Sequence, residues 1–158
     1  MRILRTIHRY RARSWSERGA FVMAAVSLLI IRTALFVLPF RRVVSLVERL
    51  AGRRQRFAPS RAAVEAAARA SAETMIWAVD AAGRRLFPAK PCLPQALAVL
   101  YGLRRRRLPA ELRIGVARDS ESGLLAHAWV DSEGKTVIGD LPAAGTYTPL
   151  PPLGLDRP

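Results

Sequence analysis

Residues 124–138 read LLAHAWVDSEGKTVI, and this stretch decides the fold class. Leu124 to Val130 and Thr136 to Ile138 have patterns that are typical of strands. The residues between them include Gly134, at a position that favours a hairpin turn. We therefore expect two adjacent antiparallel strands in the last third of the chain.

The length of the turn predicts the register of this hairpin. With a two-residue loop at 133–134, Val130 faces Val137, and a four-residue loop gives the same register. His127 then lies directly opposite Asp140, with Cβ atoms ~4.5–5.5 Å apart on one face of the sheet. A one-residue bulge would break this register.

Helices are expected before the hairpin. A helix is predicted from Cys92 to about Arg104, because Pro94 suits a first turn and apolar residues recur at helical spacing. A further strand is expected over Leu112 to Val116. Three earlier helices are predicted over residues 20–40, 41–51 and 61–82, with breaks at Pro39 and Gly83.

Helices that precede strands indicate an α+β fold, here N-terminal helices packed on a small antiparallel sheet. The 158 residues suit a single domain. We divide it into a basic N-terminal arm (1–14), a helical part (15–85), a core with the cysteine helix and the sheet (86–140), and an extended Pro-rich tail (141–158).

The first helix raises the question of a membrane span. Its unbroken apolar run, Ala20 to Ile31, is shorter than the ~20 residues that cross a bilayer. Extension to Phe40 places Arg32 near the middle, at a cost of at least ~2.5–3.5 kcal/mol. No small-residue cleavage site follows. We expect a long, largely buried helix with Arg32 on its rim, and do not favour membrane contact through residues 20–38.

The chain carries 26 Lys and Arg against 12 Asp and Glu, a formal charge of +14. This charge implies an acidic partner, which could be nucleic acid, an anionic membrane or an acidic peptide. The single cysteine excludes an intrachain disulfide and fits a reducing cytoplasm. One cysteine and two distant histidines cannot build a typical zinc site, so no metal is expected.

Cys92 and His127 are the candidates for nucleophilic catalysis. A thiolate at Cys92 would be favoured by the unpaired amides and dipole of a helix N-terminus, with Lys90 two residues before it. His127 is the only credible base, because His8 lies among the arginines of the N-terminal arm. The structural alternative is a buried thiol and a structural histidine.

Asp140 is the candidate third residue, because a carboxylate opposite His127 can orient the imidazole and stabilise its protonated form. Trp129 lies on the same face and could shield the pair from water. Asp131 is the second choice. Asp140 would then be a turn residue at the end of a strand.

The order of PCLPQALAVL, the Arg-rich residues that follow it, LRIGV and AHAWVDSEG resembles the leader peptidases of lasso-peptide biosynthesis. These are small bacterial proteins with a transglutaminase-like, papain-like fold and a Cys-His-Asp triad. The order and spacing of Cys92, His127 and Asp140 match that pattern. The match is specific over residues 88–140 and looser over 15–85.

The resemblance implies that the protein removes the leader from a ribosomally made precursor peptide, without metal or cofactor. It also implies two partners: a separate small leader-recognition protein, and the ATP-dependent cyclase that closes the ring. No winged-helix recognition segment is evident before the first helix, so we expect the peptidase half alone.

Candidate substrate contacts are Trp129, Trp77, Arg104 and Arg105. Trp77 is either core or a pocket wall, and residues 104–107 are either a solvated helix end or a docking patch for an acidic leader. Two rival functions are a transglutaminase-like acyl transferase, in which an amine resolves the thioester, and a basic nucleic-acid-binding or membrane-binding module. No RNA-binding aromatic signature or clear helix-turn-helix is evident, which argues against nucleic acid.

Overall fold

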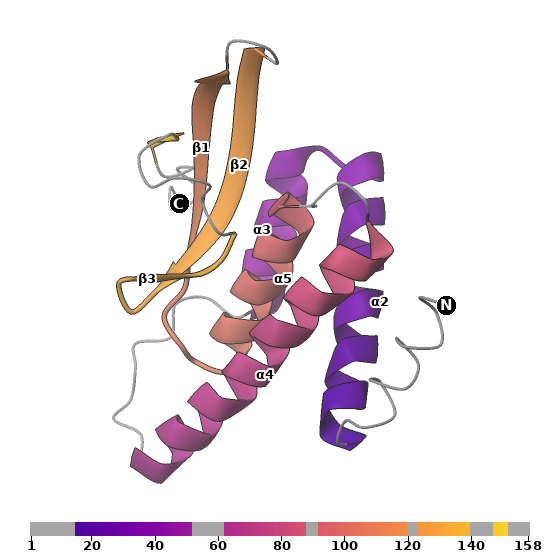
Figure 1. Cartoon of the computed structure of the whole chain (residues 1–158), viewed down its shortest axis with the longest axis vertical. Coiled ribbons are helices and arrows are strands. Elements are labelled where there is room, and N and C mark those ends of the chain that lie inside the picture. Colours follow the sequence, from indigo (N-terminus) through magenta and orange to yellow (C-terminus); the bar gives the residue numbers. More distant parts are fainter. Residues whose placement is uncertain (1–14, 52–61, 88–91, 120–122, 140–146, 152–158) are drawn as a thin grey trace.

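The computed structural model describes residues 15–51, 62–87, 92–119, 123–139 and 147–151. In these ranges, helices come first and strands follow (Figure 1). The elements are α2 (Trp15–Val37), α3 (Phe40–Ala51), α4 (Ala62–Leu86), α5 (Cys92–Arg105), β1 (Glu111–Asp119), β2 (Gly123–Ser132), β3 (Lys135–Ile138) and β4 (Thr148–Pro149). The order of elements confirms the predicted α+β class.

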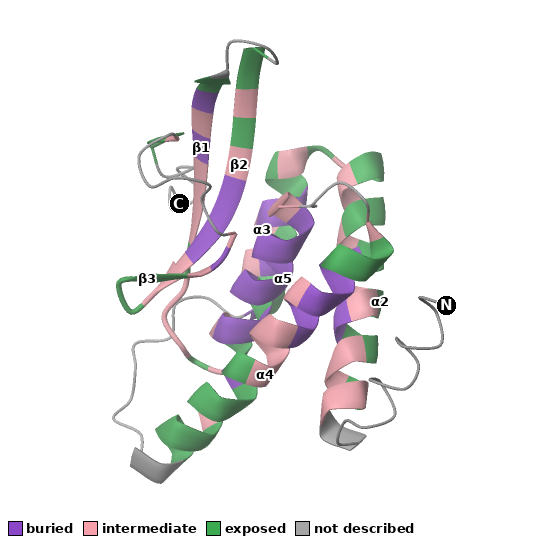
Figure 2. Ribbon diagram, viewed as in Figure 1, coloured by how far each residue is buried: buried purple, intermediate pink, exposed green. Residues whose placement is uncertain are grey.

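Helix α5 lies at the centre of the fold, between the other helices and the sheet (Figure 1). Its segment from Pro94 to Leu100 is buried, and Leu97, Val99 and Leu100 have no exposed surface. Figure 2 shows the burial concentrated along α5 and along the half of β2 beside it. Because α5 packs on α2, α3, α4 and β2, the position of Cys92 at its first residue is fixed from several sides.

The strands form one sheet in the order β3-β2-β1-β4, with antiparallel pairing throughout. Ala128 and Val130 of β2 belong to the core that α5 fills. Side chains alternate along a strand, so His127 and Trp129 point to the opposite face. This second face carries the aromatic side chains of the candidate site.

The β2–β3 hairpin confirms the predicted turn and corrects the predicted register. Glu133 and Gly134 occupy the loop with φ values of 50° and 77°, the geometry of a tight hairpin turn. Val130, however, pairs with Ile138 rather than with Val137, because a bulge shifts the register beyond Asp131. The expected pairing of Val130 with Val137 is therefore wrong, and the expected pairing of His127 with Asp140 falls on a residue outside the described ranges.

Helix α4 does not end at Gly83 as predicted but continues to Leu86. The reason is a close contact with α5. A Cβ atom on Gly83 would lie 2.7 Å from Cδ of Gln95, a side chain that is itself buried. Glycine is therefore needed at this position to let two helices approach, and not to terminate one of them.

Helix α2 ends at Val37, just before Pro39, as predicted, but it is not the largely buried helix that was expected. Only Ala24 and Leu28 among its described side chains are fully buried. Arg32 is exposed, and its guanidinium lies over the ring of Phe87, 4.7 Å from the centroid. Many other residues of α2 are exposed, as the colouring of this helix in Figure 2 shows.

Candidate active site

Cys92 is the first residue of α5 and is half-buried beside the apolar core. Pro94 follows in the first turn, where the missing N–H costs no hydrogen bond. The sulfur therefore lies at a helix N-terminus, whose unpaired amides favour an anion. Lys90, the neighbouring cation expected from the sequence, lies outside the described residues.

His127 lies half-buried in the middle of β2, in contact with two aromatic rings. The ring of Trp129 is stacked near it, with centroids 6.2 Å apart and an interplanar angle of 19°. The ring of Tyr147 lies closer, at 5.3 Å and a tilt of 37°. These rings restrict the orientation of the imidazole and keep water from part of its surface.

The imidazole also contacts the backbone. Its Nε2 atom lies 3.2 Å from the carbonyl oxygen of Gly139. A carbonyl oxygen only accepts, so this hydrogen bond requires a proton on Nε2. In the neutral ring the lone pair then belongs to Nδ1, and this atom is available as a base. Gly139 directly precedes Asp140, which lies outside the described residues.

The packing of the elements does not join the candidate residues, because the side chain of His127 points to the face of β2 opposite to the one that belongs to the core with α5. Helix α5, which begins with Cys92, packs on β2, which holds His127, and on β3, which leads towards Asp140. No hydrogen bond connects Cys92 to His127, both of which are described. Catalytic hydrogen bonds are often long in unliganded enzymes and shorten when substrate binds.

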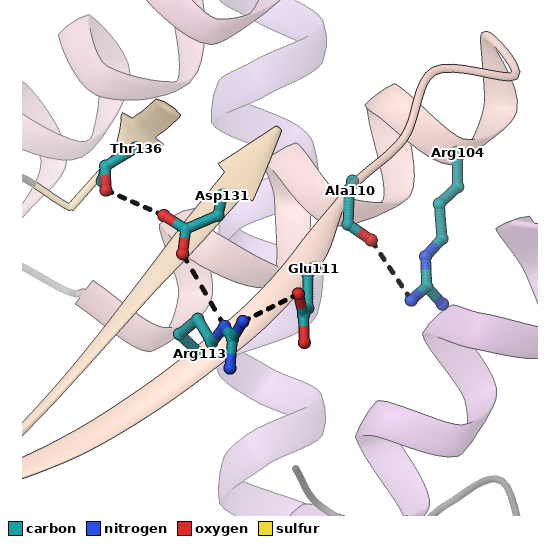
Figure 3. Close-up of polar contacts among 6 residues, drawn as sticks. All are labelled: Arg104, Ala110, Glu111, Arg113, Asp131 and Thr136. Carbon is teal, nitrogen blue, oxygen red and sulfur yellow. Dashed lines mark hydrogen bonds and ion pairs between the residues drawn. The ribbon is translucent and has the colours of Figure 1, made fainter. Parts of the chain in front are cut away.

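Asp131, the second candidate for the third residue, has other partners (Figure 3). Its Oδ1 atom accepts a hydrogen bond of 2.8 Å from Thr136, and its Oδ2 atom lies 3.7 Å from Nε of Arg113. Arg113 also donates to Glu111, at 3.0 Å. This polar network ties β1 to the β2–β3 hairpin, and among the described residues the hydrogen-bond partner of the His127 imidazole is Gly139 rather than Asp131.

Comparison with known proteins agrees with this architecture. Residues 34–151, about three quarters of the chain, match the family model of the transglutaminase-like superfamily. The chain belongs to that superfamily. Its members include cysteine peptidases and acyltransferases. Comparisons with curated proteins and with solved structures returned no match.

Within this transglutaminase-like domain, Arg104 has a structural role. Its guanidinium lies 3.2 Å from a carboxylate oxygen of Glu48 on α3. It also lies 3.4 Å from the carbonyl oxygen of Ala110, as Figure 3 shows. Arg105 is exposed. Of the two arginines proposed as substrate contacts, only Arg105 therefore presents its side chain to solvent.

The two tryptophans proposed as substrate contacts have different surroundings. Trp77 is half-buried against the core, which favours the structural interpretation. Trp129 is buried, and its ring covers Gly115 of β1, where a Cβ atom would lie 2.9 Å from it. Trp129 is therefore a neighbour that positions His127, with little surface of its own for a substrate.

Sequence reasoning missed Tyr147 and Gly139 as parts of the site. Tyr147 lies in the segment that was expected only to wrap over the surface, and β4 pairs with β1 at this point. The signal that it offered was weak: an aromatic residue two positions before Pro149, where an edge strand would tolerate proline. Gly139 offered no signal beyond its place before Asp140.

Within the described ranges, no group of three or more His, Cys, Asp or Glu side chains gathers in a way that could hold a metal ion. The chemistry that the described residues can support is that of a thiol at a helix N-terminus and an imidazole fixed by aromatic rings and a carbonyl. This combination suits attack of a thiolate on a carbonyl carbon.

Proposed function

We propose that the protein is a cysteine peptidase that removes the leader from a lasso-peptide precursor. Cys92 is the nucleophile, His127 is the general base and acid, and Asp140 is the third residue, whose carboxylate stabilises the protonated imidazole. The superfamily includes both peptidases and acyltransferases, and the sequence motifs around Cys92 and His127 resemble those of the lasso leader peptidases.

One observation carries the proposal: the imidazole of His127 is fixed with Nε2 on the carbonyl of Gly139. A histidine with a purely structural role does not need a ring nitrogen that is left without a hydrogen-bond partner. Here the contact leaves Nδ1 as the basic atom, and the residue that makes it, Gly139, directly precedes Asp140. A base needs this kind of orientation before it can act on a thiol.

The proposed reaction proceeds through a thioester. Nδ1 of His127 takes the proton of the Cys92 thiol, and the thiolate attacks the carbonyl carbon of the scissile peptide bond. The tetrahedral intermediate collapses as the imidazolium gives its proton to the leaving amine. Water, deprotonated by His127, then hydrolyses the thioester and frees the thiol. The backbone N–H of Cys92 is a suitable donor for the oxyanion.

The substrate and partners follow from the same proposal. The amine released is the N-terminus of the core peptide, which a separate ATP-dependent cyclase joins to a side-chain carboxylate. A separate small protein binds the leader and presents it to the peptidase. Exposed Arg105, in a chain of net charge +14, is suited to contact an acidic leader or this partner.

The test is cleavage of the precursor peptide encoded nearest the gene, with the recognition protein added and products identified by mass spectrometry. We expect a single cut, lost in Cys92→Ala and in His127→Ala. His8→Ala is the matched control, because it removes the only other histidine and should cut like the wild type. Equal cutting by the wild type and Cys92→Ala would exclude Cys92 as the nucleophile.

The acyl transferase alternative gives a different product in the same assay. With an added primary amine, a transferase would yield an acyl chain that carries the mass of the amine, whereas a peptidase yields the free carboxylate. If the wild-type protein gives neither cleavage nor amine transfer with the recognition protein added, a binding module without catalysis would be favoured.

A further inference from the structure

Helix α2 carries a row of apolar side chains that the described part of the chain leaves exposed, and Figure 2 shows exposed residues along this helix. Six hydrophobic side chains of this helix are at least half exposed, from 50% at Leu29 to 92% at Phe36. Their spacing places them along one side of the helix. This outer stripe consists of Val22, Met23, Leu29, Ile30, Phe36 and Val37.

The inner face holds α2 to the rest of the protein. Ala24 and Leu28 are buried, and α2 packs extensively on α4. Two cation–π contacts join α2 to α4 and to the residue that follows α4. Arg32 of α2 lies over the ring of Phe87, and Arg85 of α4 lies over the ring of Phe21 of α2, 5.3 Å from its centroid. A helix anchored in this way presents its outer stripe while it remains part of the domain.

The length and composition of the segment fit a lipid environment. Glu17–Val37 is long and apolar enough to cross a membrane by these two criteria, and helices buried in soluble proteins can meet them as well. In such a core helix most residues are covered, whereas only 11% of the most apolar part of α2 is buried. The family match begins at residue 34, so most of α2 precedes the matched region.

In the sequence, basic residues both precede and follow α2. Residues 1–51 contain ten arginines and two glutamates, and five of these arginines precede α2 in residues 1–14. Beyond the other end of the helix, Arg41 and Arg42 are exposed. Basic residues beside an apolar helical face are typical of segments that lie on anionic membranes.

We propose that α2 docks into the interface of an anionic phospholipid membrane. The outer stripe enters the acyl-chain boundary, and the flanking arginines contact the lipid phosphates. The buried inner face favours this in-plane arrangement over a span, since a span would strip Leu28 from the core. A second copy of the chain fits the outer stripe less well than an anionic membrane does. The sequence at both ends of α2 is basic, so two copies would bring like charges together in either orientation.

This inference does not depend on peptidase activity. Its test is flotation of the whole chain with vesicles of phosphatidylcholine alone or mixed with phosphatidylglycerol. We expect binding to the mixed vesicles, and a decrease of about tenfold or more in Ile30→Glu, since a charge is excluded from the acyl-chain boundary. The matched control is Leu124→Glu, which makes the same change at an exposed leucine at the tip of β2.

Equal flotation of Ile30→Glu and wild type, or no flotation with the mixed vesicles, would overturn the proposal. Light scattering in the absence of lipid separates it from self-association. A wild-type dimer that Ile30→Glu converts to a monomer would identify a second copy as the occupant and would also overturn it. Thermal unfolding of both variants should match the wild type, because the replaced side chains are exposed.

Discussion

The Nε2 atom of His127 lies 3.2 Å from the carbonyl oxygen of Gly139, and this contact links the proposed base to a glycine with a left-handed backbone conformation. Gly139 has a φ of +86°, and it follows the bulge that shifts the β2–β3 register. The backbone turn that results aims a carbonyl at the imidazole. The bulge therefore re-aims the strand end towards His127, as bulges near active sites often do.

Replacement of Gly139 by alanine should lower both stability and activity. A Cβ atom there would lie 2.8 Å from the carbonyl oxygen of Ala128 and 2.8 Å from Cβ of Trp129, at a φ that L-residues rarely adopt. We expect a loss of about 2–4 kcal/mol in the free energy of unfolding, measured by urea denaturation.

The matched control is Gly123→Ala. Gly123 has a similar φ of +79°, but nothing lies within 4 Å of the position its Cβ would take. The Gly123→Ala variant should lose only ~1–2 kcal/mol in the free energy of unfolding, which is the cost of the left-handed conformation for a residue with a Cβ atom. Equal losses at the two glycines would show that the contact with the neighbouring strand is not significant.

The ring of Tyr147 should contribute to catalysis by positioning His127. Their centroids are 5.3 Å apart, and the ring restricts the motion of the imidazole. Tyr147→Ala should lower kcat for leader cleavage about tenfold with little change in KM, because misalignment of a reacting group costs rate. Tyr147→Phe keeps the ring and should stay within about twofold of wild type.

Tyr101→Ala, which removes an exposed tyrosine of α5, is the control for nonspecific effects of losing a ring. If Tyr147→Ala cleaves as fast as Tyr147→Phe, the ring has no positioning role. A rise in KM at constant kcat would instead assign Tyr147 to binding of the peptide.

Much of the fold followed from local signals in the sequence. Pro39 separates α2 from α3, Cys92 begins α5, and the turn at residues 133–134 was expected from the glycine. Each of these features depends on backbone preferences that a single residue type expresses. Burial of α2 was not predictable in this way, because a hydrophobic helix has the same composition whether or not another surface covers it.

The candidate residues differ in how visible they are in the sequence. Cys92 and His127 were identifiable because they are rare residues in favourable positions. The register of the hairpin beyond Asp131 was not predictable, because the extra residue of a β-bulge has no recognisable sequence pattern in a short strand. The contact between Tyr147 and His127 joins residues whose proximity depends on the path of the tail over the sheet.

The close approach of α4 and α5 at Gly83 and Gln95 should be detectable as coupling between the two residues. A Cβ on Gly83 would lie 2.7 Å from Cδ of buried Gln95, so Gly83→Ala should cost about 1–3 kcal/mol of unfolding free energy. In a Gln95→Ala background the same change should be neutral or stabilising, because alanine is the better helix former. A double-mutant cycle measures the coupling.

Gly19→Ala is the control for this cycle, since Gly19 lies in α2 with nothing within 4 Å of the point that an added Cβ would occupy. It should stabilise the protein by up to about 1 kcal/mol through helix propensity alone. A destabilising effect of Gly83→Ala that persists in Gln95→Ala would show that the backbone of α5, rather than the glutamine side chain, limits the approach.

The C-terminus of α5 should become more stable when Arg107 is replaced by glycine. The N–H of Leu108 donates to the carbonyl of Leu103, and the N–H of Arg107 donates to that of Arg104, so the helix ends in a Schellman motif. Arg107 holds the left-handed position of this motif with a φ of 60°. We expect Arg107→Gly to raise the free energy of unfolding by about 0.5–1 kcal/mol, because glycine adopts this conformation without strain.

Arg105→Gly, the same substitution in the last turn of α5, is the matched control. There the backbone is helical, and glycine should lower the free energy of unfolding by up to about 1 kcal/mol. The two variants remove the same charge from the same basic cluster, so a change in electrostatic repulsion would move both in one direction. Opposite signs in urea denaturation would therefore assign the gain at Arg107 to its backbone conformation, and equal signs would refute that assignment.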